Sequence, residues 1–472
     1  MNNLLLIALL FAPLASGTAQ LQAGVAKVDI TDRTVPVNDP LYAKALVLRC
    51  GDTTVAIITV DAVAIGEIGR IKNDFLGNVR AQLQKELNIP PSHVLINASH
   101  CHGVVCAEVE QRTVQVVKDA SRNLVPVKVG AGRGHEDRIS ENRRLKLRDG
   151  TETDVRHAYS TAPDEEIVGT GPIDLEIGLL RLDKQDGKPL AVVYNFAVHP
   201  IQGVPSRGNT ADITGFASKT IEDNLGHGAL ALFLQGCCGD INPVGYKDVH
   251  HPRDAEPLGK MLGESALKAL KTIQTRETTE LRVVNETLAL PRAADFEQRI
   301  AALQAEQARL LQSLTGTSLN LKTFTELFPR FKEGKLDAEN KANVERYMRN
   351  VYAMEKFTRL QVNLALLKKH QARNAAAGSP TMDVEIMGVR IGDFVLVTFP
   401  GELTVEVGLN IKKRAPAPFT FVAGVTNGYI YYAPTAERRK NKGFAQEDCD
   451  CLLAPEWQKL FEDKVADILK AL

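Results

Sequence analysis

The chain has 472 residues, of which 44% are hydrophobic and 24% are charged, a composition typical of a globular protein large enough for more than one structural unit. Lys plus Arg and Asp plus Glu number 57 each, so the formal net charge is zero. This balance excludes a nucleic-acid partner held by bulk positive charge, and we expect no nucleic acid.

Residues 1–19 have the pattern of a secretory signal peptide. The apolar run at 4–14 is too short to cross a bilayer, and small residues before Gln20 fit a cleavage site. The usual Lys or Arg near the start is missing, so an uncleaved N-terminal anchor is the alternative. The sequence therefore predicts a protein that is secreted or periplasmic.

Strands and helices alternate through most of the chain, which predicts an α/β fold with a mixed sheet. Before residue 293 we expect strands at 45–48, 55–60, 94–98, 127–130, 179–182, 190–198, 229–234 and 280–290. We expect helices at 67–88, 107–121, 215–225 and 254–274, and mostly loop at 131–170. Beyond the middle of the chain we expect strands at 384–389, 394–399 and 419–423, and a last helix at 457–469.

The composition changes at about residue 293. A heptad-like apolar repeat then runs through a stretch rich in Gln, Glu and Arg and fades near 377, with Pro329 between its two halves. This pattern predicts an inserted helical hairpin at 293–377. We expect it to be a scaffold, and a lid or a partner-binding arm is the alternative.

Two histidines follow the strand expected at 94–98. His100 and His102 are two residues apart, so in an extended chain their side chains point to the same face and can meet at one ion or substrate atom. Imidazole is the commonest nitrogen ligand of zinc. Two surface histidines on a loop are the alternative.

Three further polar side chains, His199, Glu402 and Tyr432, also come just after apolar strands. Loops at the carboxyl ends of strands gather functional groups in α/β sheets, so these side chains and His100 could meet. Two His and one carboxylate with an open position form a common catalytic zinc site. The structural alternatives are a turn contact for His199, a helix cap for Glu402, a core position for Tyr432, and a loop contact for Asp240.

Several of the seven cysteines lie near these motifs. Cys101 and Cys106 flank His102, and Cys237 adjoins Cys238. An odd number leaves at least one cysteine unpaired. The crowding indicates either a disulfide near the site or soft metal ligands, and the sequence leaves this choice open.

Taken together, the motifs resemble the neutral ceramidase family (the neutral and alkaline, non-lysosomal ceramidases), particularly short bacterial members that carry its N-terminal catalytic domain. They follow the family's order and cover most of residues 22–470 apart from the helical insert. The matching stretches are Ala45-Leu46-Val47-Leu48, Asn97-Ala98-Ser99-His100-Cys101-His102-Gly103, Asn142-Arg143-Arg144, Asn195-Phe196-Ala197-Val198-His199-Pro200, Gln235-Gly236-Cys237-Cys238-Gly239-Asp240-Ile241-Asn242-Pro243, Phe399-Pro400-Gly401-Glu402 and Asn427-Gly428-Tyr429-Ile430-Tyr431-Tyr432.

The resemblance implies a secreted hydrolase that cleaves the N-acyl amide bond of a ceramide-like lipid with zinc-activated water. The implied Zn²⁺ ligands are His100, His199, Glu402 and Tyr432. It also implies that His102 orients the water or the substrate, and that Arg143 faces the substrate carbonyl or the developing oxyanion. Residues 20–292 and 378–472 would form this domain, and any membrane contact would be peripheral.

Two departures from the family pattern bear on the substrate. The family's His-Thr-His-Ser-Gly-Pro-Gly reads His100-Cys101-His102-Gly103-Val104-Val105-Cys106 here, and a second family Tyr is replaced by Phe444, which cannot donate a hydrogen bond. We therefore expect the metal site to carry over better than ceramide specificity. Two alternatives stay open: a metallohydrolase of another ester or amide, and a zinc-containing module that binds a ligand without cleaving it.

Overall fold

The structure, a computed structural model, describes residues 20–154, 162–246, 248–250, 252–443 and 445–472. The predicted signal peptide at 1–19 and the Phe444 position both lie outside the described residues. Within those ranges, none of the helices combines the length and the apolar character that crossing a bilayer requires.

A mixed sheet of eight strands, ordered β12-β11-β10-β5-β1-β2-β3-β4, forms the centre of the body. The first half of the sheet contains β1 (Gln22–Asp29), β2 (Tyr42–Cys50), β3 (Thr53–Val60) and β4 (Val94–Ala98). The second half contains β5 (Val125–His135), β10 (Glu176–Lys184), β11 (Pro189–Phe196) and β12 (Leu230–Gln235). The pairs β3–β4 and β11–β12 are parallel, and the other neighbouring pairs are antiparallel.

The two halves of this sheet fold toward each other, although β12 and β4 stand at opposite ends of the strand order. They join where Gln22 pairs with Pro126 and Ala23 with Val125. Strand β12 contacts β3 and β4, and the backbone N–H of Gln235 donates to Oδ1 of Asn97 at 2.9 Å. The carboxyl ends of β4, β11 and β12 are thereby brought close together.

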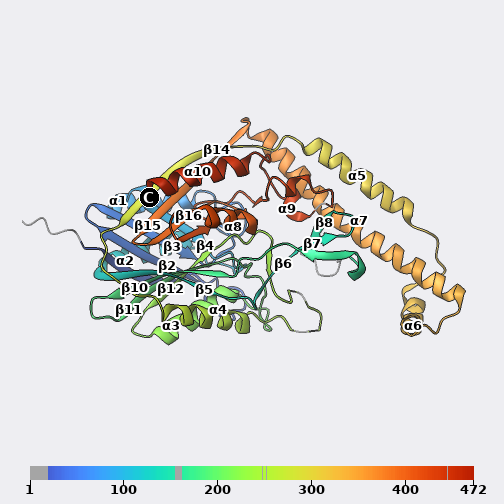
Figure 1. Cartoon of the computed structure of the whole chain (residues 1–472), viewed down its shortest axis with the longest axis horizontal. Helices are drawn as coiled ribbons and strands as arrows, with labels where there is room; N and C mark the ends of the chain where they lie inside the picture. The colour runs from blue at the N-terminus through green and yellow to red at the C-terminus, as the bar shows by residue number, and fades with distance from the viewer. Residues whose placement is uncertain (1–19, 155–161, 247, 251, 444) are drawn as a thin grey trace, which may run out of the picture.

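Helices cover the outer faces of both halves, as the alternating burial of the strands requires. In β2, Ala45 and Val47 face the helices, whereas Leu46 and Leu48 face the inner core. The first half is covered by α1 (Phe75–Leu87) and α2 (Val109–Arg122), and the second by α3 (Asp212–Leu225) and α4 (Ala255–Leu270) (Figure 1).

A second sheet packs against the inner core of the first. It contains β14 (Leu281–Pro291), β15 (Thr381–Ile391), β16 (Phe394–Thr398) and β18 (Phe419–Ala423). Its other face carries α8 (Val405–Arg414) and α10 (Trp457–Ala471). The α/β fold with mixed sheets, predicted from the alternation of elements, is confirmed.

Short strands connect the larger elements. They are β6 (Ser140–Asn142), β7 (Arg144–Leu147), β8 (Glu152–Asp154), β9 (Ile167–Thr170), β13 (Ile241–Pro243), β17 (Glu402–Leu403) and β19 (Tyr432–Ala433). The segment 131–170, predicted as mostly loop, therefore contains several strands. The helix predicted at 67–88 begins only at Phe75, because Gly66 and Gly69 take φ values of +100° and +76°, which a helix does not allow.

Three helices, α5 (Phe296–Ser313), α6 (Leu321–Lys332) and α7 (Ala338–Ala376), form an arm that projects from the body, with α6 at its far end (Figure 1). Leu303 and Leu310 of α5 pack against Leu360 and Leu364 of α7. The sequence predicted two helices divided near Pro329, but this proline lies inside α6. The side chains of Asn320 and Asp337 cap the N-terminal ends of α6 and α7, which explains where each of these helices begins.

Candidate metal centre

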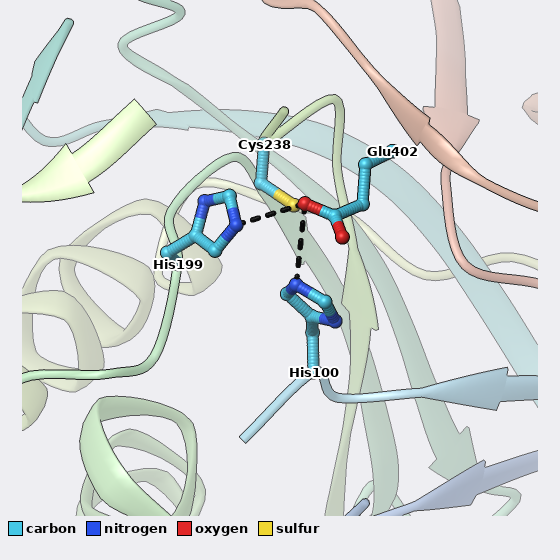
Figure 2. Close-up of side chains that lie close together, drawn as sticks. All are labelled: His100, His199, Cys238 and Glu402. Atoms are coloured by element: carbon cyan, nitrogen blue, oxygen red, sulfur yellow. Dashed lines mark hydrogen bonds and ion pairs between the residues drawn. The ribbon is translucent and has the colours of Figure 1, made fainter. Parts of the chain in front are cut away.

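Four buried side chains converge where the strands of the two sheets end (Figure 2). His100 follows β4, His199 follows β11, Cys238 follows β12, and Glu402 opens β17 after β16. One ligand atom from each of the four lies within 4.8 Å of those of the others. Of the predicted ligands, His100, His199 and Glu402 therefore meet, and Cys238 joins them.

Backbone carbonyls fix the orientation of both imidazoles. Nδ1 of His100 donates to the carbonyl of Val63 at 2.6 Å, and Nδ1 of His199 donates to that of Ile241 at 2.9 Å. His100 takes a φ of +67°, a value uncommon for a residue with a side chain, and this local strain is consistent with a functional position. Each ring therefore directs Nε2 toward the centre of the cluster, as metal-binding histidines do.

The two Nε2 atoms face one carboxylate oxygen. Oε2 of Glu402 is 2.9 Å from Nε2 of His199 and 3.4 Å from Nε2 of His100. Burial lowers the pKa of His199 to about 4, despite its contact with Glu402, so this ring is neutral at pH 7. A neutral ring that carries its hydrogen on Nδ1 presents a lone pair at Nε2. A cation, either a proton or a metal ion, then has to lie between this lone pair and the carboxylate.

The carboxylate of Glu402 is kept ionised. Burial alone would raise its pKa, but the imidazoles of His100 and His199 outweigh burial and hold the pKa well below the usual range of a glutamate. Glu402 does not cap a helix, because α8 begins three residues later and Oδ1 of Asp240 accepts the N–H of Val405 at 2.8 Å. Asp240 therefore has the structural role, and Glu402 is available as a ligand.

Cys238 is a fourth candidate ligand, which was not among those predicted. Its loop approaches β17 closely: a Cβ added to Gly239 would lie 2.8 Å from the carbonyl oxygen of Glu402. Burial raises the pKa of the Cys238 thiol well above its usual value, so the group is a neutral thiol unless a cation favours the thiolate. All seven cysteines are free thiols, which excludes a disulfide near the site. Cys238 therefore fits the other alternative, a soft metal ligand.

Two tyrosines of the same segment support Glu402. The hydroxyl of Tyr429 donates to Oε1 of Glu402 at 2.5 Å, and burial together with this carboxylate raises the pKa of Tyr429 well above its usual value. Tyr432, the fourth predicted ligand, pairs with Glu402 in the parallel β17–β19 register, and the Arg143 guanidinium lies over its ring at 5.4 Å. Tyr429 was not predicted from the sequence as a site residue, although it lies in the same aromatic motif as Tyr432.

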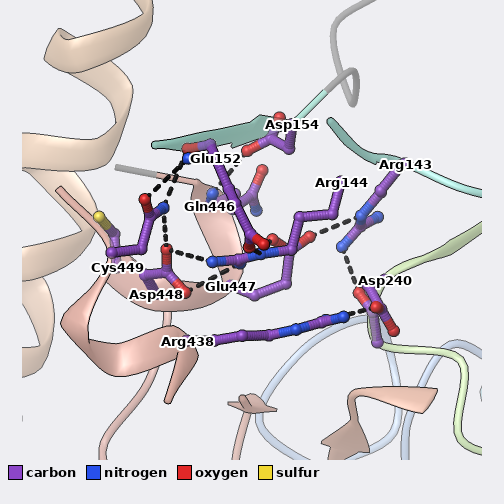
Figure 3. A network of polar contacts seen from close by, with 12 residues as sticks. Arg143, Arg144, Glu152, Asp154, Asp240, Arg438, Gln446, Glu447, Asp448 and Cys449 are labelled. Carbon is purple, nitrogen blue, oxygen red and sulfur yellow. Dashed lines mark hydrogen bonds and ion pairs between the residues drawn. The ribbon is translucent and has the colours of Figure 1, made fainter. Parts of the chain in front are cut away.

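Arg143 is fully buried beside the cluster, within the ion network drawn in Figure 3. Its Nε donates to Oε1 of Glu447 at 2.6 Å, and its Nη2 donates to the carbonyl of Gly239 at 2.5 Å. Burial alone would lower the pKa of this guanidinium, but Glu447, Tyr432 and Glu402 outweigh burial and raise it. Arg143 is thus a permanent positive charge close to Glu402.

His102 is exposed, unlike the four clustered side chains. Its ring centre is 5.8 Å from that of His100, and it lines a 370 Å³ cavity together with Val104, Ile201 and Tyr246. A larger cavity of 540 Å³ lies between the arm and the β7–β8 region, and none of its lining residues belongs to the cluster. Of the two cavities, only the smaller one is lined by a predicted site residue, His102, which lies next to His100 of the cluster.

No protein-family model matches the chain, and no curated protein matches its sequence. Two solved structures match its fold. One is described as neutral ceramidase from Pseudomonas aeruginosa, with a TM-score of 0.63 and 17% identity over 96% of this chain and 75% of that chain. The other, described as ceramidase complexed with C2, has a TM-score of 0.61 with the same identity and coverage. The chain therefore shares the fold of these two ceramidases, as the resemblance seen in the sequence implies.

Proposed function

We propose that the chain is a zinc-dependent hydrolase that cleaves the N-acyl amide bond of a ceramide-like lipid. The observation that carries this proposal is the buried convergence of Nε2 of His100, Nε2 of His199 and Oε2 of Glu402, whose lone pairs need a cation between them. The shared fold with two ceramidases supports the choice of an amide bond in a lipid.

Zinc is the metal that fits these donors best. Imidazole nitrogen, carboxylate oxygen and thiolate sulfur are all common zinc ligands, whereas Mg²⁺ and Ca²⁺ prefer oxygen alone. His100, His199 and Glu402 would hold the ion, with Cys238 or Tyr432 as a further ligand. A bound zinc ion supplies Lewis-acid polarisation of a carbonyl and lowers the pKa of a water molecule to about 7.

The chain's own residues would perform the remaining tasks. His102, exposed at the cavity and close to His100, can take a proton from the attacking water and return it to the leaving amine. Arg143, buried and permanently charged near Glu402, favours negative charge that develops on the substrate carbonyl oxygen. Tyr429 holds the second oxygen of Glu402 and so fixes the direction of the carboxylate.

We further propose that the hydrolase domain is formed by 20–292 and 378–472, with 293–377 inserted, and that the protein acts outside the cytoplasm. The apolar run and small-residue site at 1–19 support export. Fusing 1–19 to a periplasmic reporter enzyme would test export, since cleavage of the fusion near Gln20 supports it and retention of the uncleaved fusion in the cytoplasm contradicts it.

The direct test of the activity is fatty-acid release from a short-chain ceramide by the purified protein, before and after treatment with a zinc chelator. We expect release that stops with the chelator, returns when zinc is added, and is absent in the His199→Ala variant. Undiminished release after complete zinc removal would contradict the metal assignment. No release from a protein that retains one zinc per chain would contradict the lipid substrate and favour another amide or ester.

A further inference from the structure

We infer that the C-terminal end of α7 positions the candidate metal centre, with His370 and Arg373 as positioning residues. This inference rests on the metal centre proposed above. The arm, for which the sequence indicates no link to the ligands, would thereby have a role in the site.

His370 contacts the backbone partners of Glu402 and Tyr432. Its side chain is fully buried, its Nε2 donates to Oδ1 of Asp450 at 2.5 Å, and its ring lies edge-on to that of Tyr431 with centres 4.7 Å apart. The carbonyl of Asp450 accepts the N–H of Tyr432 at 3.1 Å, and the carbonyl of Tyr431 accepts the N–H of Glu402 at 2.9 Å. One side chain of the arm therefore supports both strands of the β17–β19 pair.

The hydrogen bonds of His370 define its role. Its Nδ1 is buried and has no hydrogen-bond partner among the residues that the structure describes, so a hydrogen on that atom would be an unsatisfied donor. The ring therefore carries its hydrogen on Nε2 and donates it to Asp450. A side chain that keeps a donor at this point should preserve the contact, whereas one without a donor should not.

Arg373, one helical turn later, extends the same support to His100. Its Nη1 donates to the hydroxyl of Tyr431 at 2.9 Å, and its guanidinium lies over that ring at 5.2 Å. Its Nη2 forms an ion pair with Glu67. Glu67 belongs to the loop that also contains Val63, whose carbonyl orients His100.

The end of α7 thus contacts residues next to three predicted ligands, Glu402, Tyr432 and His100. Tyr431 has a φ of +65°, a conformation that costs free energy and persists only where its surroundings enforce it. His370, Arg373 and Lys369, whose amine lies 4.6 Å from the Tyr431 ring centre, supply those surroundings. Loss of these contacts should let Tyr431 relax and move the backbone of Glu402.

Hydrogen exchange in the metal-free protein tests this directly, because it reads the backbone rather than the loaded enzyme. We expect His370→Ala to speed exchange of the Glu402 and Tyr432 amides about tenfold and to weaken zinc binding about tenfold, with kcat reduced and KM little changed. His370→Gln, which retains a donor, should return the exchange rates and the zinc affinity most of the way to their wild-type values. Leu367→Ala, a fully buried truncation on the same helix, should lower stability and leave both quantities unchanged.

The outcomes separate this inference from the proposed function. If wild-type protein binds no zinc, the metal centre is wrong, and the exchange result alone decides the role of His370. If wild-type protein binds zinc and His370→Ala changes neither exchange nor zinc affinity relative to Leu367→Ala, the positioning role is wrong. An equal effect of His370→Gln and His370→Ala would contradict the donor role.

Discussion

The hydroxyl of Tyr429 donates to Oε1 of Glu402 at 2.5 Å, while Oε2 of the same carboxylate faces the two histidines. This contact fixes the carboxylate in the direction in which it would bind a metal. We predict that Tyr429→Phe weakens zinc binding about tenfold, the effect typical of losing a partner of a metal ligand. Competition with a fluorescent chelator measures it. Tyr194→Phe, which loses hydrogen bonds to Thr214 and Ser218 and none to Glu402, should bind zinc as wild type does.

Cys238 and its neighbour Cys237 give a matched pair of variants. Both are buried, but Cys238 belongs to the ligand cluster and the sulfur of Cys237 packs near Gly408. We predict that Cys238→Ser weakens zinc binding 10- to 100-fold and that Cys237→Ser leaves it unchanged. Equal zinc affinities of the two variants, together with a loss in Tyr432→Phe, would instead assign the fourth ligand to Tyr432.

Removing Arg143 should destabilise the protein as well as inactivate it. Arg143→Met deprives the fully buried Glu447 of its closest cationic partner, which costs about 3 kcal/mol or more of the free energy of unfolding. Urea denaturation at pH 7 measures this loss. The double variant Arg143→Met/Glu447→Gln should regain part of it, because no uncompensated carboxylate remains. If the loss of unfolding free energy in the double variant equals the sum of the losses in the two single variants, the pairing of Arg143 with Glu447 is contradicted.

Stability at low pH should depend on Glu447. Burial alone would raise its pKa, but Arg143 and Arg144 outweigh burial and lower the pKa from 4.5 to about 2. Because the folded pKa is below the unfolded one, the stabilisation is complete above about pH 4.5 and is lost as the pH falls toward 2. The difference in the free energy of unfolding between wild type and Glu447→Gln should therefore shrink over this window. For the exposed Glu437→Gln control, we expect no such change.

His102 should matter for turnover and not for metal binding. It is exposed at the cavity, and its role would be to move protons. We predict that His102→Ala retains its zinc and its melting temperature but loses 10²- to 10⁴-fold in kcat. His135→Ala, another exposed histidine, is the control. Loss of zinc from His102→Ala would show instead that His102 is a metal ligand. An unchanged kcat would show that His102 takes no part in the reaction.

The sequence allowed the α/β fold and three clustered residues to be predicted, because His100, His199 and Glu402 each follow an apolar strand and strand ends converge. Cys238 could not be separated from Cys237 by sequence, since the difference arises where its loop meets β17, which lies far along the chain. The burial of Arg143 depends on Glu447, 304 residues away. The contacts of His370 likewise depend on how the arm meets the body.

Anomalous X-ray diffraction at the zinc absorption edge, from crystals grown with zinc, would locate the metal itself. We predict one strong peak within about 2.1 Å of Nε2 of His100 and Nε2 of His199, in contact with a carboxylate oxygen of Glu402. The peak should also show whether Cys238 or Tyr432 completes the site. A fully occupied zinc elsewhere, with no peak between these side chains, would show that they do not form the metal centre.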